Sequence, residues 1–281
     1  MTELRSSPVA ALPTIAKQAD IANRVPPPKG PELNAVPGPL AHAFAQASLA
    51  PELHKPIAHY LAGLERWNHV HNLTRVADPV DAFHRHVLES FDLIPEIDWV
   101  VTRHAEECRL IDIGTGAGIP GLLLAIAMHY TNRPALSEIL LVEPAAKRVA
   151  FLRAMIAELG LAKVRVYPQR LEDLLSEPSH HAAYKVATSR AFAAPEHWLP
   201  MIAPLMGADA HALVMLAGKP DDWRPVANDD SIDSGHPRFA QWLLRAIEPQ
   251  GDLRAKWMSS DRKRELAPVE ARHVARFQFS P

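Results

Sequence analysis

A glycine-rich loop directly behind a short apolar run is the feature that most constrains the fold of this chain. The run Leu110-Ile111-Asp112-Ile113 is typical of a buried strand, and Gly114, Gly116 and Gly118 follow it. A helical pattern begins at Ile119. Glycines let a ligand approach the backbone closely, so a strand, a glycine loop and a helix in this order predict a ligand-binding turn. We expect this turn at the carboxyl edge of a parallel sheet.

The remainder of the chain supports a sheet of that kind. Short apolar runs alternate with helical periods from Arg109 onwards, as in βα units. The predicted strands cover 110–113, 139–142, 164–167, 184–188, 211–216, 242–247 and 273–279, and the predicted helices cover 119–128, 145–159 and 195–203. The predicted fold class is therefore α/β with a mainly parallel sheet.

Two segments of different character precede the sheet. Residues 1–39 are rich in Pro and Ala, and Val25-Pro26-Pro27-Pro28 cannot sustain a helix or a strand, which predicts a disordered tail. In residues 40–105 the apolar positions recur with a helical period, and Leu61, Leu64 and Trp67 fall on one face. We therefore divide the chain into the tail 1–39, a helical N-terminal extension 40–105 and a sheet domain 106–281.

Composition limits the compartment and the partners. The 281 residues carry a formal net charge of -2, so a nucleic-acid partner would have to be bound by local basic clusters such as Lys147-Arg148. The single cysteine, Cys108, excludes an internal disulfide and a cysteine-based zinc site. The longest apolar run, 122–128, is too short to span a bilayer. We expect a cytoplasmic, monomeric protein without a membrane segment.

The glycine loop by itself leaves two cofactor classes open. Gly116, Gly118 and Gly121 also match the dinucleotide pattern of nicotinamide enzymes. Asp112 favours S-adenosylmethionine, because a carboxylate at the end of the first strand suits the ammonium of that cofactor better than it suits a pyrophosphate. Glu143 follows the second strand, where a carboxylate can accept hydrogen bonds from ribose hydroxyls in either class.

Two further positions bear on cofactor and metal binding. Leu171 and Glu172 follow the third strand, where an apolar side chain can cover an adenine face and a carboxylate can receive its amino group. Glu172 is equally well explained as an acid at the start of a helix. The paired histidines at 69/71, 84/86 and 180/181 have no cysteine or carboxylate partner at ligand spacing, so we expect no metal centre.

The absence of two sequence motifs limits the choice of methyl acceptor. A carbon-5 pyrimidine acceptor needs a nucleophilic cysteine after the later strands, whereas Cys108 precedes the first strand. Exocyclic amino acceptors usually accompany an Asn- or Asp-Pro-Pro-aromatic turn after the fourth strand, and this chain has Thr188-Ser189-Arg190-Ala191-Phe192 there. Arg190 suits a ring nitrogen such as guanine N7, which carries no proton and lies beside a carbonyl acceptor. It could equally contact the cofactor or a phosphate, or pair with Glu172 or Glu196.

Five ordered segments resemble the RsmG (GidB) methyltransferases of bacterial small-subunit ribosomal RNA, with coverage from about residue 53 to 218. They are Trp67-Asn68-His69-Val70-His71-Asn72-Leu73-Thr74, Arg85-His86-Val87-Leu88-Glu89-Ser90, Asp112 through Gly121, Lys147-Arg148-Val149-Ala150-Phe151-Leu152 and Ser189-Arg190-Ala191. The chain differs from the family after the fifth strand. The family usually has Lys-Gly there, whereas this chain has Ala217-Gly218-Lys219, in which the lysine follows the glycine.

The resemblance implies a class I methyltransferase (Rossmann-like) fold in residues 106–281, behind the helical extension. It implies S-adenosyl-L-methionine as the cofactor, and transfer of its methyl group to N7 of one guanine in the decoding-region loop of 16S rRNA, with the small ribosomal subunit as partner. Arg190 is then the predicted catalytic residue. The predicted cofactor-binding residues are Asp112, Gly114, Gly116, Gly118, Ile119, Glu143, Leu171, Glu172 and Arg190. A non-catalytic assembly factor that retains the fold is the remaining alternative to an enzyme.

Overall fold

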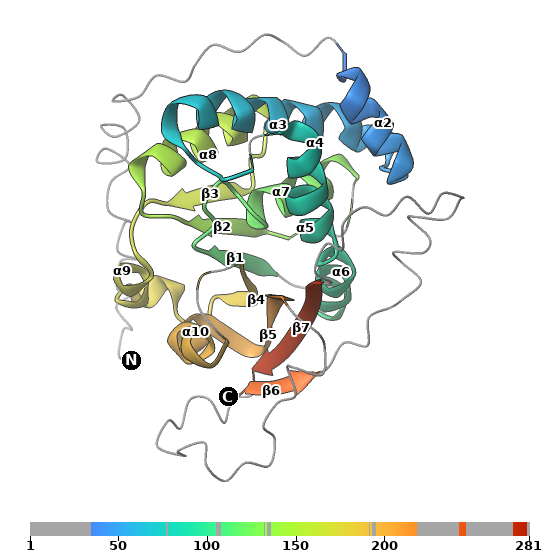
Figure 1. Ribbon diagram of the computed structural model, residues 1–281. Coiled ribbons are helices and arrows are strands. Elements are labelled where there is room, and N and C mark those ends of the chain that lie inside the picture. The colour runs from blue at the N-terminus through green and yellow to red at the C-terminus, as the bar shows by residue number, and fades with distance from the viewer. Residues whose placement is uncertain are drawn as a thin grey trace, which may run out of the picture.

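The computed structural model describes residues 35–76, 78–104, 108–131, 133, 136–190, 192, 195–217, 242–245 and 272–279. Within them a seven-stranded sheet runs in the order β3-β2-β1-β4-β5-β7-β6 (Figure 1). The strands are β1 (Arg109–Ile113), β2 (Glu138–Val142), β3 (Val164–Tyr167), β4 (Tyr184–Ser189), β5 (Met206–Ala217), β6 (Trp242–Arg245) and β7 (Arg272–Phe279). Strands β1 to β5 are parallel and β7 is antiparallel to both of its neighbours. The predicted mainly parallel α/β fold is confirmed.

The strand order reverses next to β1. The chain passes from β1 through β2 to β3 at one edge, and β4 then returns to the other side of β1. The carboxyl ends of β1 and β4 therefore border the topological switch point, which is where open α/β sheets bind ligands. This topology brings the glycine loop to the position that the sequence predicted for it.

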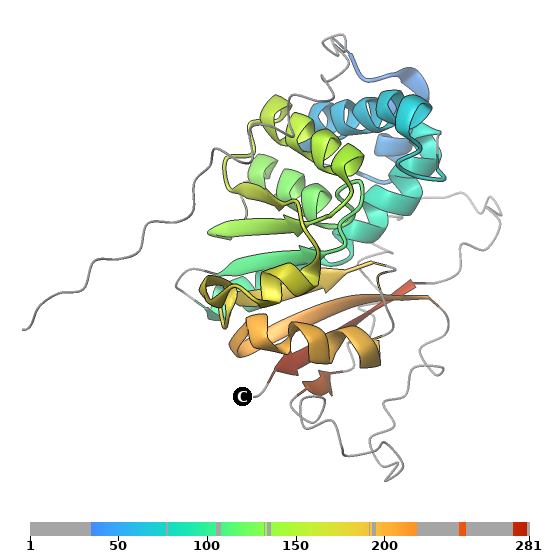
Figure 2. The same ribbon diagram turned by 90° about the vertical axis from the view of Figure 1, so that its left-hand side faces the viewer.

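The two faces of the sheet carry different helices (Figure 2). Leu110 and Leu141 point into a core shared with the helices α6 (Ile94–Arg103), α7 (Gly121–Tyr130) and α8 (Ala146–Glu158). The alternate residues, Ile111 and Leu140, point into a second core with the helices α9 (Leu171–Leu175) and α10 (Pro195–Ile202). This alternation follows from the two-residue side-chain period of a strand. Two short 3-10 helices, Pro178–His180 and Ala203–Leu205, complete this side.

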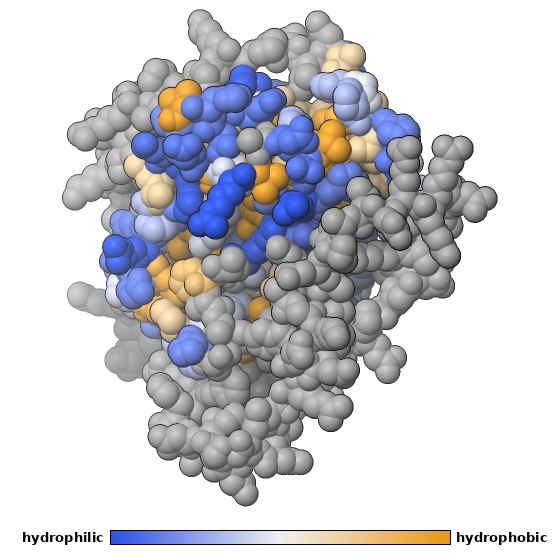
Figure 3. Space-filling view, viewed as in Figure 1, coloured by the Kyte–Doolittle hydropathy of each residue, from blue (hydrophilic) through white to orange (hydrophobic). Residues whose placement is uncertain are grey.

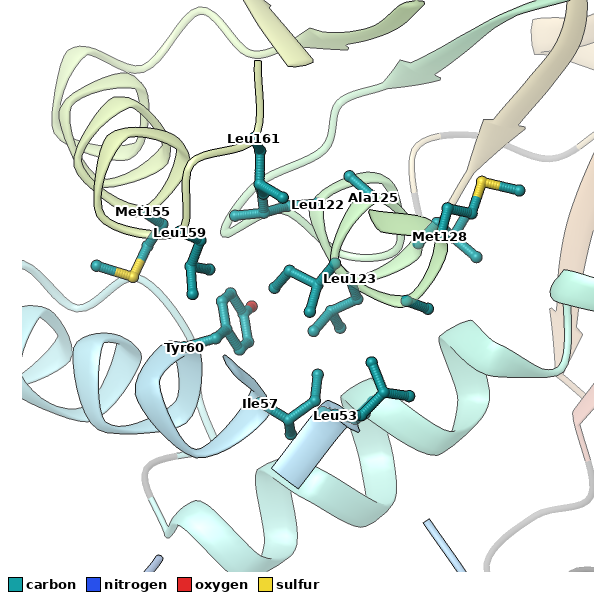
Figure 4. Packing of buried hydrophobic residues seen from close by; sticks show 14 of the residues in the cluster. Leu53, Ile57, Tyr60, Leu122, Leu123, Ala125, Met128, Met155, Leu159 and Leu161 are labelled. Carbon is teal, nitrogen blue, oxygen red and sulfur yellow. The ribbon is translucent and has the colours of Figure 1, made fainter. Parts of the chain in front are cut away.

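The helical extension packs on the outside of α7 and α8. It consists of α2 (Gly38–Gln46), α3 (Pro51–His71), α4 (Pro79–Ala82), the π-helix η1 (Phe83–Leu88) and α5 (Glu89–Phe91). Leu53, Ile57 and Tyr60 of α3 point towards Leu123 of α7 and Met155 of α8 (Figure 4). Further along α3, the predicted apolar face at 61, 64 and 67 is buried. The extension and the sheet thus share one hydrophobic core.

Differences from the sequence-based elements are small and local. Helix α2 begins at Gly38, two residues before the predicted start of the extension, and residues 1–34 lie outside the described residues. Strand β5 begins at Met206, five residues before its predicted start. Strands β6 and β7 are close to their predicted positions. Helix α9 confirms the alternative that Glu172 lies at the start of a helix, and the π-helix was not predicted. No helix in the described ranges is both long enough and apolar enough to cross a bilayer.

Candidate active site

Three predicted site residues lie in one row along the carboxyl edge of the sheet. Ile113, the last residue of β1, is in register with Val142 of β2 and with Ser189 of β4. The residues that follow these aligned strand ends are Gly114, Glu143 and Arg190. The row therefore brings a glycine, an acidic residue and a basic residue together at the switch point of the sheet.

Five N–H groups of the glycine loop are bonded within the protein. Gly114 and Thr115 donate to the Val142 carbonyl at 3.0 and 3.1 Å, and Gly116 donates to Glu143 Oε2 at 3.0 Å. Gly118 and Ile119 donate to the Thr115 carbonyl, both at 2.9 Å. The loop is a self-bonded turn, built with positive φ angles of 68°, 61° and 88° at its three glycines.

Asp112 lies beneath this loop and is fully buried. Its Oδ2 accepts the N–H of Gly121, the first residue of α7, at 2.8 Å. Burial raises the pKa of Asp112 to about 7, and the Thr115 hydroxyl and the Gly121 N–H partly oppose this rise. In the structure this carboxylate caps a helix from within the protein. Its predicted contact with the cofactor ammonium stays a prediction.

The raised pKa of Asp112 predicts a dependence of stability on pH. In the unfolded chain the pKa has its ordinary value of 3.8, so between this value and about 7 the folded protein holds a proton that the unfolded chain has released. The stabilisation is thus complete below the lower value and is lost as the pH rises through the upper one. Asp112→Asn keeps an acceptor for Gly121 and cannot ionise. Its free energy of unfolding, from urea titrations at about pH 5 and about pH 8, should fall less than that of the wild type. An equal fall in both proteins would contradict the assignment.

Glu143 is buried at the end of β2 and holds two backbone segments. Its Oε2 accepts from Gly116 and its Oε1 accepts from the Ala145 N–H at 2.8 Å. Arg148 on α8 lies 3.6 Å from Oε2 as an ion-pair partner. The carboxylate therefore ties the glycine loop to the β2–α8 turn, and hydrogen bonding to a ribose stays a prediction.

The glycines of the loop have different steric roles. A Cβ added at Gly118 would lie 2.5 Å from Leu122 Cβ, so this glycine allows the loop to pack on α7. A Cβ at Gly116 would meet nothing closer than the Gly114 carbonyl at 4.0 Å. The space outside Gly116 is thus open, as a ligand-binding loop requires, and half-buried Ile119 closes the loop.

The two predicted residues after β3 begin helix α9. Leu171 is buried in the second core, and Glu172 is exposed in the first turn of the helix. An acid in the first turn is favourable because of the partial positive charge at a helix N-terminus. The structure therefore supplies a local reason for each residue, and their contacts with an adenine remain predictions.

Arg190 is held by the helical extension. Its Nη2 lies 2.9 Å from Oε2 of Glu89, and its Nη1 donates to Nδ1 of His86 at 3.0 Å. The side chains of Arg190 and Glu89 are 13% and 4% exposed, so this is a buried ion pair. The partner suggested by the sequence, Glu172, is exposed on α9, and the side chain of Glu196 lies outside the description. Arg190 therefore pairs with Glu89 and not with Glu172.

The contact with Arg190 fixes the tautomer of His86. A guanidinium only donates, so Nδ1 of His86 must be the acceptor and the ring hydrogen is on Nε2. Nε2 faces the hydroxyl of Thr74 at 3.3 Å, and Asn68 accepts the N–H of Thr74 at 2.8 Å. A chain of polar contacts therefore runs from the end of α3 through the π-helix to the end of β4.

A second contact joins the extension to the site. The hydroxyl of buried Tyr60 on α3 donates to the Ala117 carbonyl in the glycine loop at 2.9 Å. The extension thus holds both the glycine loop and Arg190.

Hydrophilic side chains gather on the surface over α3 and α4, on the face of the molecule seen in Figure 3. Across the described ranges, no three His, Cys, Asp or Glu side chains come close enough together to hold a metal ion.

Comparison with known proteins identifies the family. Residues 53–233, more than half of the chain, match the family model GidB, described as rRNA small subunit methyltransferase G. The chain belongs to this family. As a GidB family member it is a methyltransferase.

Curated relatives named ribosomal RNA small subunit methyltransferase G are similar over most of their length. The protein of Alkalilimnicola ehrlichii is 35% identical over 163 residues, which are 58% of this chain and 66% of the relative. The protein of Leptothrix cholodnii is 31% identical over 220 residues, or 78% and 88% of the two chains. A solved methyltransferase structure from Geobacter sulfurreducens is 12% identical, with 88% and 99% of the chains covered and a TM-score of 0.47. At this score it adds nothing to the assignment.

The GidB match begins inside α3 and so includes the part of the extension that holds Arg190. The sequence analysis gave Glu89 no role and considered His86 only within the paired histidines 84/86, although the segment 85–90 was one of those that resembled the family. The signal that could have revealed them is the spacing of His86, Glu89 and Ser90, which places three polar residues on one face of a helix. Its partner follows β4, about a hundred positions further along the chain.

Proposed function

We propose that this chain transfers a methyl group from S-adenosylmethionine to N7 of a guanine in 16S rRNA. Membership of the GidB family supports the methyl transfer and the ribosomal RNA substrate. One structural observation carries the choice of cofactor: five N–H groups of the glycine loop and the first three of α7 are already bonded to acceptors of the protein itself. The proposal places the reaction in the cytoplasm, on the small ribosomal subunit.

A dinucleotide cofactor binds its pyrophosphate at the glycine loop and at the N-terminus of the helix that follows. Here Asp112 accepts the first N–H of α7, and the N–H groups of Leu122 and Leu123 are bonded to the Gly118 carbonyl at 2.9 and 3.2 Å. A second carboxylate, that of Glu143, accepts the N–H of Gly116. A pyrophosphate would displace these contacts and meet two acids. S-adenosylmethionine has no phosphate, so the arrangement favours it over a nicotinamide cofactor.

The chain offers a cradle that fits the cofactor. In the proposal, the cofactor lies in the open space outside Gly116. It is bordered there by Gly114, Gly116, Gly118 and Ile119. Glu143 receives the ribose hydroxyls, and Leu171 and Glu172 border the adenine. When bound, the cofactor supplies a methyl group on a positively charged sulfur.

The proposed acceptor needs no catalytic base, because guanine N7 has a lone pair and no proton to remove. The task left to the protein is orientation and charge balance. Arg190, the proposed catalytic residue, orients the base through its O6 carbonyl. Glu89 offsets the charge of Arg190, so the cationic side chain does not repel a base that becomes positively charged on methylation.

Two measurements test the proposal. Purified protein, S-adenosylmethionine and small ribosomal subunits from cells lacking the gene should yield N7-methylguanine, located by mass mapping of the 16S rRNA. Absence of methylation with intact subunits would refute the acceptor. Calorimetric titration should show binding of S-adenosylhomocysteine and none of NADH, whereas tight binding of NADH alone would decide for an oxidoreductase.

A further inference from the structure

An aromatic side chain next to Arg190 is unusually exposed. In the part of the chain that the structure describes, two large apolar side chains are exposed, Val70 at 68% and Phe192 at 41%. Val70 lies in the last turn of α3. Phe192 follows Arg190 by two positions at the carboxyl edge of β4. An apolar ring at this edge loses the stabilisation that burial would give it, so its place calls for a reason.

The ring of Phe192 lies directly against the glycine loop. A Cβ built on Gly114 would be 2.8 Å from Cδ2 of the ring and 3.6 Å from both Cγ and Cε2. The ring therefore lies against the backbone of Gly114 itself, and a side chain at this position would force the ring to move. Gly114 belongs to the row that also holds Glu143 and Arg190. Phe192 is thus part of the switch-point site although it is exposed.

We propose that Phe192 is the surface on which the acceptor guanine stacks, and that its ring stabilises the charge that the base acquires. The inference rests on the proposed function. Single-stranded RNA bases are commonly bound by stacking on aromatic side chains. A ring that borders both the cofactor loop and Arg190 can hold a base in the place where the methyl group must be received.

The charge balance of the reaction gives the ring a second effect. The N7 lone pair forms a bond to the methyl carbon, the carbon–sulfur bond breaks, and its electron pair remains on sulfur. The sulfonium becomes a neutral thioether and the guanine gains one positive charge. The electron-rich face of an aromatic ring attracts a cation, so Phe192 binds the charged base more strongly than the neutral one. An interaction that strengthens towards the transition state raises kcat as well as affinity.

The experiment compares Phe192→Leu with Phe192→Tyr and Phe192→Trp, and uses Val70→Ala as the matched exposed control. Substrates are small ribosomal subunits and saturating S-adenosylmethionine. Phe192→Leu should lower kcat about 3- to 30-fold, and kcat/KM for the subunit about 5- to 150-fold. Tyr and Trp should retain most of the activity because they keep a ring face, and Val70→Ala should match the wild type. A kcat for Phe192→Leu equal to that of the wild type would overturn the proposal.

Two further readouts separate the proposal from its competitors. Fluorinated phenylalanines at position 192 keep the size of the ring and withdraw charge from its face, so log kcat should fall stepwise with the number of fluorines. A flat series would overturn the charge effect. Binding of S-adenosylhomocysteine should be the same in Phe192→Leu and the wild type. A loss of that binding as large as the loss of kcat/KM would assign the ring to the cofactor and overturn the stacking role.

The proposed function can fail separately from this inference. If the wild type methylates no ribosomal RNA, the proposed function is refuted. Stacking is then still measured by calorimetry with 7-methylguanosine monophosphate and guanosine monophosphate. Wild type should prefer the methylated nucleotide, whose base is positively charged, and Phe192→Leu should lose this preference. Equal binding of both nucleotides by the wild type would overturn the inference.

Discussion

Replacement of Glu89 with Leu is expected to lower the free energy of unfolding by about 3–5 kcal/mol, because it leaves the charge of Arg190 buried without its partner. The same change should lower the rate of methyl transfer by about 100-fold, the loss typical of a misplaced catalytic group. Urea denaturation and the subunit methylation assay measure the two effects. The prediction concerns residues on opposite sides of the boundary between the extension and the sheet domain.

The double variant Glu89→Leu/Arg190→Met separates stability from activity. Removing both charges replaces the ion pair with an apolar contact, so most of the lost stability should return. Activity should stay as low as in the single variant, because the guanidinium is absent. A double variant as unstable as Glu89→Leu would show that the unpaired charge is not the cause. A double variant with restored activity would remove Arg190 from the catalytic role.

Gly121→Ala is expected to have the second large effect. A Cβ at this position would lie 2.5 Å from Leu141 Cδ2 and 2.6 Å from Asp112 Oδ2, so α7 would have to move away from β1 and β2. Such overpacking costs about 3 kcal/mol of stability. Movement of α7 would also break the hydrogen bond from Gly121 to Asp112. The glycine loop would then lose its support. We expect binding of S-adenosylhomocysteine to become undetectable by calorimetry.

Gly38→Ala is the control for this prediction. Gly38 is the first residue of α2, and a Cβ there would meet nothing within 4 Å. Its stability should equal or slightly exceed that of the wild type, since alanine restricts the unfolded chain. If Gly121→Ala were as stable as Gly38→Ala and bound S-adenosylhomocysteine normally, the close packing of α7 on β1 would be unimportant for the site.

The sheet and the row of site residues could be predicted because their signals are local. The first two strands are short and mainly aliphatic, and Gly114 and Glu143 follow them directly, as Arg190 follows β4. Parallel strands in register then bring these residues to one edge. Knowledge of the strand ends was therefore enough to gather residues from distant parts of the chain.

The partners of the buried charges could not be predicted in the same way. The sequence suggested Glu172 of α9 as a partner for Arg190, but the ion pair is with Glu89, which is brought close by the packing of the extension on the sheet. The position of Asp112 was predicted, while its role as a cap for α7 depends on how closely Gly121 approaches β1. Side-chain pairing across layers follows from tertiary packing, which no sequence window contains.

The π-helix at Phe83–Leu88 makes the winding of the extension critical for chemistry in the sheet domain. Asp78 caps the start of α4, and a π-helical turn then takes one residue more than an α-helical turn before Glu89 is reached. If the same residues formed an α-helix instead, Glu89 would be rotated by about 100° about the helix axis. Its carboxylate would then turn away from Arg190 while every strand of the sheet stayed intact. The winding of one turn outside the sheet thus sets the direction of the acid that holds Arg190.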